Sequence, residues 1–173
     1  MSAIRSRDRA AGPGLVLLHS PLVGPLCWQP LVERLRADGH RMIAPDLRAA
    51  ATSGDHQQSF VADAVAALRV AGMSRTVLVG HSGAGPLLPA IAAVTATVGV
   101  IYVDARLPRP GASWFDTVPP PLAAHLTRLA DENGVLPRWS DWFGPEVLTE
   151  TIPDAPLRAR FIEELPPLSL SYF

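Results

Sequence analysis

Short apolar runs alternate with longer segments of helical pattern in the first 104 residues. Four of these runs are apolar at consecutive positions: Leu15 to His19, Met42 to Pro45, Thr76 to Gly80 and Val98 to Asp104. Strands that are buried on both faces of a parallel sheet have this pattern, because helices cover both faces of such a sheet. The runs therefore predict one mostly parallel sheet.

Apolar residues between the runs recur at the spacing of an amphipathic helix. One helix is predicted around Trp28 to Leu35, with Gly39 as its C-terminal cap, and a second over Phe60 to Leu68, ending near Gly72. Strands and helices in this order form right-handed crossovers. The predicted fold class is an open α/β sheet with helices on both faces.

A third helix is predicted from Ser82 to about Thr97. It is apolar on nearly every side, which indicates a helix buried beside the sheet. Pro86 falls near its start, but Pro89 lies further in, where its ring would collide with the carbonyl of Gly85. We expect a kink or a late helix start there.

The alternation stops after Asp104, where a proline-rich segment begins. Weak helical patterns follow at Leu122 to Ala130 and Pro156 to Leu165, with Asp154 placed to cap the last helix. We predict an α/β core over residues 1–104 and a helical, cap-like subdomain of the same domain over residues 105–173. The aromatic residues of this second part either pack it onto the sheet or line an apolar substrate pocket: Trp114, Phe115, Trp139, Trp142 and Phe143.

Composition and charge narrow the classes of partner. The 173 residues are 48% hydrophobic, as expected of a globular domain, and the net charge of −1 leaves no basic surface for nucleic acid. Cys27 is the only cysteine, which excludes an internal disulfide and a thiolate metal cluster. No apolar stretch reaches about 18 residues and no secretory signal pattern is evident. We expect a cytoplasmic protein with no membrane partner, metal or cofactor.

The strand ending at Gly80 runs into the turn Gly-His-Ser-Gly-Ala-Gly. A strand that turns sharply into a helix needs Gly80 and Gly83, because a side chain at either position would clash where the backbone is crowded. Ser82 is then held in a tight, strained position with its hydroxyl above the sheet, at a helix N-terminus that favours a developing oxyanion. The alternative is that Ser82 is an ordinary helix N-cap.

These residues resemble the α/β-hydrolase superfamily. "LVLLHSP" corresponds to its strand followed by a His-Gly turn, "CWQPLVERLRADGHRMIAPDLR" to its first helix and next strand, and "VLVGHSGAG" to its nucleophile elbow. The resemblance covers residues 15–104 and leans toward the small esterases and hydroxynitrile lyases. It implies that Ser82 is the nucleophile, that the N–H of Gly83 is one oxyanion donor, and that the residues after Asp104 form the cap.

The turn after the first strand departs from the family. Pro21 stands where the resemblance implies the second oxyanion donor, and proline has no N–H. Either the N–H of Leu22 replaces it or the oxyanion hole is half made, and losing one such donor costs about a hundredfold to a thousandfold in rate. Ser20 replaces the glycine of the turn, and its hydroxyl is an alternative donor.

The largest departure from the family pattern concerns the base that would activate Ser82. The family places a catalytic histidine after a last strand, whereas this chain ends in "LPPLSLSYF", so we expect a chain cut within its domain. His19 is interpreted as structural, and His81 is expected to point away from Ser82. His56 follows the second strand on the ligand-binding side and is a weak candidate base. Asp104 ends a strand on that side and either orients a histidine or forms a salt link or loop cap.

Two classes of function follow. The first is a serine hydrolase that acts through Ser82 on a carboxylic ester or similar small, apolar acyl substrate. The second is a truncated or inactive hydrolase fold that binds an apolar small molecule or a protein partner, with a homo-oligomer formed through the open sheet edge at Val98 to Asp104 as one form of it. A lyase on the same scaffold is a further alternative.

Overall fold

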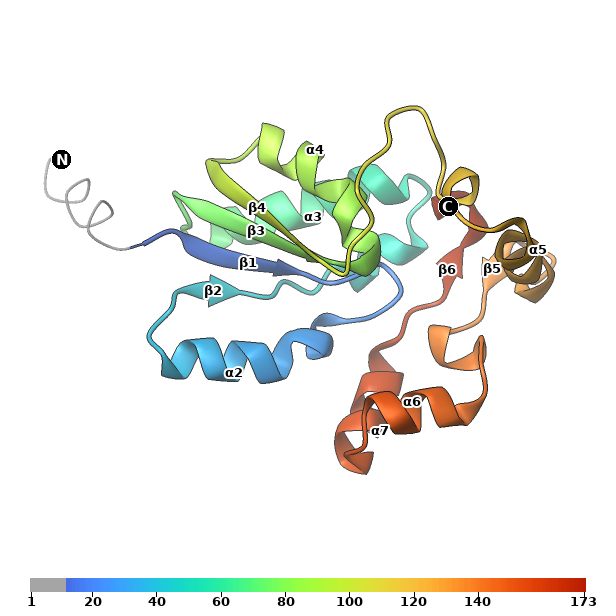
Figure 1. The fold of residues 1–173 in the computed structure, drawn as a ribbon. Coiled ribbons are helices and arrows are strands. Elements are labelled where there is room, and N and C mark those ends of the chain that lie inside the picture. Colours follow the sequence, from blue (N-terminus) through green and yellow to red (C-terminus); the bar gives the residue numbers. More distant parts are fainter. Residues whose placement is uncertain (1–11) are drawn as a thin grey trace, which may run out of the picture.

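A parallel sheet forms the centre of the molecule in the computed structural model, which describes residues 12–173 (Figure 1). Its strands are β1 (Gly14–Leu18), β2 (Met42–Ile43), β3 (Thr76–His81) and β4 (Thr97–Val103), in the spatial order β2-β1-β3-β4. Every pairing between them is parallel. The predicted sheet is confirmed, although residues 1–11 of the predicted core lie outside the described part of the chain.

The central strands of the sheet are covered on both faces. Successive side chains of a strand point to opposite faces, so one strand contacts helices on both sides. In β1, Leu17 packs with Trp28 and with Val32 of helix α2 (Gln29–Ala37). Its neighbours Val16 and Leu18 join the cluster that contains helices α3 (His56–Val70) and α4 (Leu88–Ala93). Figure 1 shows α2 on one side of the sheet and α3 and α4 on the other. The predicted α/β class, with helices on both faces, is confirmed.

The helix ends agree in part with the prediction. Gly39 and Gly72 follow α2 and α3 with φ of +81° and +61°, the left-handed conformation expected of C-terminal caps. The third segment begins as a 3₁₀ helix (Ser82–Leu87) and becomes α-helical only at Leu88, with Pro89 in the first turn. The expected late start is therefore confirmed.

The predicted extent of this third helix is wrong at its C-terminal end. Helix α4 ends at Ala93, and Thr97 is already the first residue of β4. The segment after Ala93 is rich in β-branched residues, which favour strands, and the Thr95 hydroxyl donates to the carbonyl of Ile91, closing the last turn at 2.8 Å.

Strand β4 lies at an outer edge of the described sheet and pairs there only with β3. The apolar run predicts a strand that is covered on both faces. Val98 is 51% exposed and Ile101 is 48% exposed, so β4 is not covered in this way. Strands β1 and β3 are well buried, as their patterns predict. The apolar pattern therefore located β4 correctly but not its surroundings.

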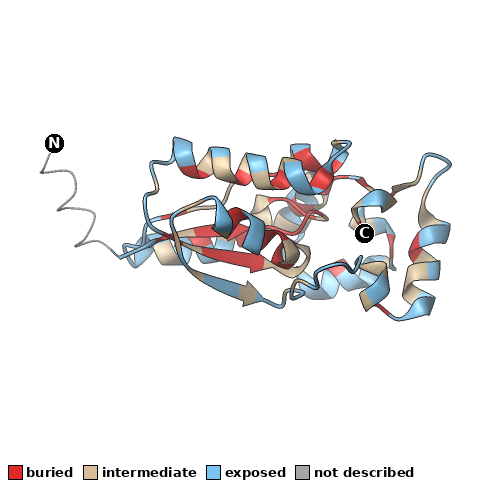
Figure 2. Ribbon diagram, turned by 90° about the horizontal axis from the view of Figure 1, so that it is seen from above, coloured by how far each residue is buried: buried red, intermediate tan, exposed pale blue. Residues whose placement is uncertain are grey.

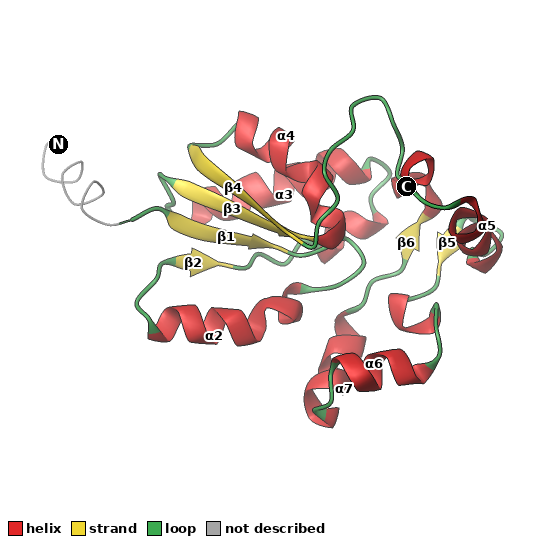
Figure 3. Cartoon of the chain, viewed as in Figure 1, coloured by secondary structure: helices red, strands yellow, loops and turns green. Residues whose placement is uncertain are grey.

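Residues 105–173 contain three α-helices, α5 (Pro120–Leu129), α6 (Pro145–Thr151) and α7 (Ala155–Glu164). Two short strands, β5 (Val135–Leu136) and β6 (Leu168–Ser169), pair antiparallel (Figure 3). The carboxylate of Asp154 accepts the N–H of Leu157 at 2.7 Å, so it caps α7 as predicted. Neither α6 nor the pair of strands was predicted.

Buried residues run from the sheet into this second part, as Figure 2 shows in red. Leu126, Leu136 and Trp142 belong to the same apolar cluster as Leu18 and Phe60 of the core. No helix among residues 12–173 is long and apolar enough to cross a membrane.

Candidate active site

The strand order of the sheet reverses between β1 and β3. In open α/β sheets, ligands bind at the carboxyl ends of the strands on either side of such a reversal. Here the turn after β1 contains Ser20 to Leu22, and the turn after β3 begins at Ser82. The topology therefore brings together the two turns that the sequence predicts to form the site.

Ser82 has a left-handed backbone, with φ of +52°. A residue with a β-carbon adopts this conformation at a cost of about 1–3 kcal/mol, and only where its surroundings hold it there. The neighbouring glycines supply that confinement. A β-carbon at Gly80 would lie 2.8 Å from Leu88 Cδ1, and one at Gly83 would lie 2.9 Å from Ser20 Oγ. The sharp, crowded turn predicted from the sequence is therefore present.

The turn departs at one position from the strict elbow pattern Gly-x-Ser-x-Gly. The second glycine of that pattern falls at position 84, where this chain has Ala84. The Ala84 side chain is fully buried and belongs to the main apolar cluster. The next residue, Gly85, also has a close neighbour, because a β-carbon there would overlap the main-chain carbonyl oxygen of Arg106.

The turn after β1 lies beside Ser82. Ser20 is 2% exposed, and the N–H of Leu22 donates to its hydroxyl at 3.4 Å, a long hydrogen bond. Ser20 and Leu22 line the same two pockets as Ser82. The two alternatives for the second oxyanion donor, the Leu22 N–H and the Ser20 hydroxyl, therefore both border the space next to Ser82.

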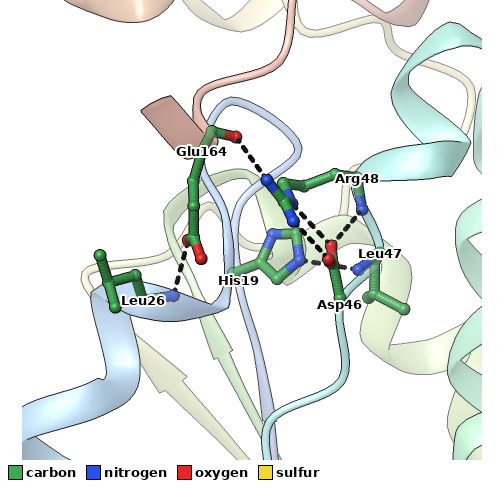
Figure 4. A network of polar contacts seen from close by, with 6 residues as sticks. All are labelled: His19, Leu26, Asp46, Leu47, Arg48 and Glu164. Carbon is green, nitrogen blue, oxygen red and sulfur yellow. Dashed lines mark hydrogen bonds and ion pairs between the residues drawn. The ribbon is translucent and has the colours of Figure 1, made fainter. Parts of the chain in front are cut away.

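His19 holds this turn in place, as the sequence interpretation expects. Its Nε2 accepts the N–H of Leu47 at 2.9 Å, which leaves Nδ1 protonated to donate to the carbonyl of Ser20 at 2.8 Å. Burial lowers the pKa of His19, so the ring stays neutral and keeps this tautomer. The His19 ring therefore has a structural role, in which it links the turn after β1 to Leu47 (Figure 4).

A polar network around His19 also fixes the second part of the chain to the first (Figure 4). The Glu164 carboxylate, at the end of α7, accepts the N–H of Leu26 at 2.9 Å, and its main-chain carbonyl accepts from Arg48 at 3.5 Å. Arg48 is paired with Asp46 at 2.6 Å, and this hydrogen bond lowers the pKa of the Asp46 carboxyl. Helix α7 is thus held against the loop that follows β1.

The C-terminal residues reach the other side of the elbow. The Tyr172 hydroxyl donates to the carbonyl of Gly83 at 3.0 Å, and burial raises the Tyr172 pKa, so the hydroxyl remains a donor. The carbonyl of Phe173 accepts the N–H of Trp114 at 2.6 Å. The N–H of Arg106 donates to the carbonyl of Ser82 at 3.2 Å. The turn is therefore held by contacts that are distant in sequence.

His56 is not brought to Ser82. Its Nε2 lies 3.1 Å from the Ser171 hydroxyl and its Nδ1 lies 3.3 Å from the carbonyl of Ala50. The ring is buried and does not line either of the pockets that contain Ser82. The geometry therefore does not support His56 as the base.

Asp104 and His81 are electrostatically coupled. Asp104 follows β4 with an exposed side chain and a φ of +43°. Burial lowers the pKa of His81, and the Asp104 charge opposes that effect in part. His81 stacks edge-on against Trp28 at 5.9 Å, and its buried Nδ1 has no hydrogen-bond partner among the described residues. The carboxylate thus acts on the histidine next to Ser82, without a hydrogen bond to it.

Two pockets meet at Ser82. The larger pocket has a volume of about 750 Å³ and lies under the loop that contains Arg106 and Arg109. The smaller pocket, of about 440 Å³, lies between the loop after β1 and helices α6 and α7. Trp114 lines the larger pocket and Trp139 the smaller, whereas Trp142 packs in the core. The aromatic residues of the second part therefore serve both packing and pocket lining.

Metal ligation has no support in the described part of the chain. No three His, Cys, Asp or Glu side chains of residues 12–173 are grouped as a metal site would require. Cys27 lines the smaller pocket, and burial raises the pKa of its thiol to about 12. It is therefore a neutral thiol at physiological pH.

The fold and the turn together define a class: a parallel α/β protein that carries a strained serine between a central strand and a helix. The model of the alpha/beta hydrolase family matches residues 15–171, and the chain belongs to this family. The resemblance noted in the sequence is thus confirmed and extends through the residues after Asp104.

Solved structures with the same fold include three enzymes or enzyme variants. An extracellular α/β-hydrolase from a Paenibacillus species, described as sharing structural and functional homology with tobacco salicylic acid binding protein 2, is 20% identical with a TM-score of 0.70, covering 91% of this chain and 67% of that chain. A variant of tomato methylketone synthase I complexed with β-ketoheptanoate is 19% identical with a TM-score of 0.66, covering 92% and 69%. A variant of the pyrethroid hydrolase PytH is 23% identical with a TM-score of 0.64, covering 93% and 69%.

The present chain thus spans about two thirds of the length of each of these structures. Identities this low show the shared fold alone. No curated protein matches the chain.

Proposed function

We propose that this protein hydrolyses small carboxylic esters with Ser82 as the nucleophile. The observation that carries the proposal is the left-handed backbone of Ser82 at the carboxyl end of β3, beside the turn after β1. Such strain is typical of functional sites, and the nucleophile elbow is one of them. An ordinary N-cap serine has an extended backbone. Ser82 instead has a left-handed backbone and is the first residue of the 3₁₀ helix, whose N-cap position is occupied by His81.

In the proposed reaction the Ser82 oxygen attacks the ester carbonyl carbon, the alcohol leaves with a proton, and water then hydrolyses the acyl-serine. The negative charge on the carbonyl oxygen is proposed to be stabilised by the N–H groups of Gly83 and Leu22. The long hydrogen bond from the Leu22 N–H to the Ser20 hydroxyl supports this assignment, because a weakly held donor is available to a stronger acceptor.

A serine hydroxyl needs a base to accept its proton. Among residues 12–173, no histidine forms a hydrogen bond with the Ser82 hydroxyl, and His19 and His56 are engaged elsewhere. Asp104 remains the proposed carboxylate that orients a histidine, since it follows β4 at the same edge of the sheet at which Ser82 follows β3. The proposal therefore rests on the nucleophile and on the oxyanion site.

The missing base contact favours a second candidate, in which the same two pockets bind an apolar small molecule without turnover. Both candidates use a small-molecule ligand, and they differ only in whether Ser82 reacts. The test of that difference is reaction with an electrophile, because a fluorophosphonate labels an activated serine and not an inert one.

The experiment uses a fluorophosphonate probe and p-nitrophenyl butyrate. We expect labelling at Ser82 and turnover in the wild type, with both reduced by about a thousandfold or more in Ser82→Ala. Ser140→Ala is the matched control, because the Ser140 hydroxyl lies in the 3₁₀ helix Trp139–Asp141 and donates to the neighbouring Asp141. An unlabelled, inactive wild type that is folded by circular dichroism would contradict hydrolysis and support the binding candidate.

A further inference from the structure

Ser82 stands on the border between two chemically different pockets. Ser20, Leu22 and Ser82 line both of them, whereas the remaining walls are different. An ester bond held at Ser82 therefore has one space available on each side of its carbonyl carbon. Because the proposed reaction keeps the acyl group on Ser82 and releases the alcohol, the two spaces have different tasks.

The smaller pocket is walled by apolar side chains from the loop after β1 and from the second part of the chain. Those that matter here are Val23, Leu26, Leu148, Leu157 and Phe161. Several of them also form a separate apolar cluster that joins α6 and α7 to the loop after β1. The wall is therefore built from packed elements rather than from a free loop.

Apart from Ser82 and from His81, whose buried Nδ1 has no partner among the described residues, the polar side chains of the smaller pocket already have partners or are neutral. The Asp154 carboxylate caps α7, and the Thr151 hydroxyl donates to the carbonyl of Val147 at 2.7 Å. The Cys27 thiol is neutral at physiological pH, because burial raises its pKa to about 12. The lining contains no Lys or Arg, so an anionic ligand group would find no cationic partner in this space, whereas an apolar group would lose no hydrogen bond.

The larger pocket is more polar. Arg106, Arg109 and Gln57 line it. The Arg106 guanidinium lies 5.1 Å above the Trp114 ring and donates to the side chain of Thr117 at 3.1 Å, so its position is fixed. A departing alcohol needs solvation and an exit, and this pocket offers polar walls for it.

We propose that the smaller pocket is the acyl-binding site and that it selects aliphatic acyl groups of medium length, with the alcohol part of the ester in the larger pocket. This assignment rests on the proposed function. The smaller pocket has a volume of about 440 Å³, near the low end of the range of about 300–1,000 Å³ for small-molecule sites. This volume limits the length of the acyl chain that the pocket holds.

The test is a series of p-nitrophenyl esters from acetate to decanoate, in which the leaving group is constant. We expect kcat/KM to rise by about fourfold with each added methylene until the pocket is filled, and then to fall. Leu157→Trp narrows the pocket from its half-buried position on α7 and is expected to lower kcat/KM for hexanoate at least tenfold more than kcat/KM for acetate. Leu157→Ala is expected to move the optimum to a longer chain.

Ala112→Trp is the matched control, because exposed Ala112 lines the larger pocket only. It is expected to leave the preferred acyl length unchanged. A flat profile in the wild type, or a change of preferred length in Ala112→Trp rather than in Leu157→Trp, overturns the assignment. Thermal denaturation of all variants establishes that each is folded.

The acyl-binding pocket can be tested even in a protein that hydrolyses no ester. If the wild type hydrolyses no ester, the proposed function fails, and calorimetric titration with methyl acetate, methyl butyrate and methyl hexanoate then tests the pocket alone. Saturable binding that tightens with chain length and is lost in Leu157→Trp supports an apolar acyl-sized site. Binding that is undetectable, or that is equal in the wild type and Leu157→Trp, overturns it.

Discussion

The glycines near Ser82 make room for neighbouring chain segments, whereas the unusual backbone conformation belongs to the serine itself. Gly80, Gly83 and Gly85 all have ordinary φ values, but a β-carbon at any of them would meet an atom of another segment. Ser82 is the residue that adopts φ of +52°. The crowding therefore holds the serine in its strained position, which is the relation that the sequence motif implies.

The closest of these approaches gives a prediction for Gly85. Gly85→Ala would place a methyl group against the main-chain carbonyl of Arg106, which cannot move as a flexible side chain does. We expect the free energy of unfolding to fall by about 1–3 kcal/mol, as overpacked sites generally show, and ester turnover to fall with it. Urea denaturation followed by circular dichroism measures the change.

Gly54→Ala is the control for this substitution, because no atom lies within 4 Å of a β-carbon at Gly54 and its φ is not in the left-handed range. We expect a change of less than about 0.5 kcal/mol there. Equal destabilisation by the two substitutions would show that the approach of Arg106 does not confine the turn.

Several residues of the candidate site were predictable because their signals are local. Ser82 and its glycines follow from one turn, and Leu22 follows from the missing N–H of Pro21. The contact between the Tyr172 hydroxyl and Gly83 joins residues 89 positions apart, and no short pattern encodes it. Its role in holding the elbow became visible only in the folded chain.

At the scale of elements, periodicity located the long helices and the strands of the sheet. It failed where elements are too short to repeat a pattern, as in β5 and β6, which have two residues each. It also failed at the end of α4, where a run of apolar residues fits a helix and a strand equally well. A local capping signal, that of Asp154 before α7, was more reliable, because a single side chain determines it.

The cap of α7 provides a prediction at this scale. Asp154→Ala removes the acceptor of the Leu157 N–H and is expected to lower the free energy of unfolding by about 1 kcal/mol. For a chain of this length, that corresponds to a fall of roughly 2–4 °C in Tm. Differential scanning calorimetry measures it.

Asp154→Asn keeps an oxygen acceptor in the same place and serves as the comparison. It should retain most of the stability that Asp154→Ala loses. A Tm for Asp154→Ala equal to that of the wild type would mean that the packing of α7 against the core is sufficient without the cap.

At the scale of the whole molecule, the two parts of the chain depend on each other. The smaller pocket has one wall from the loop after β1 and the other from α6 and α7, so its shape requires that these elements stay together. The Glu164 carboxylate and its bond to the N–H of Leu26 join them across 138 residues. This bond is a point at which the stability of the fold and the shape of the pocket are coupled.

Glu164→Ala tests that coupling. The substitution leaves the partly buried N–H of Leu26 without its acceptor, and an unpaired donor of this kind costs about 1–3 kcal/mol. We expect urea denaturation to show a loss of stability in that range, together with weaker binding of methyl hexanoate, because Leu26 lines the smaller pocket. Glu163→Ala is the matched control, since the Glu163 side chain is exposed on the same helix and the charge change is the same. If the two variants lose equal stability, the loss arises from the change in net charge, and the hydrogen bond between Glu164 and Leu26 does not hold the two parts together.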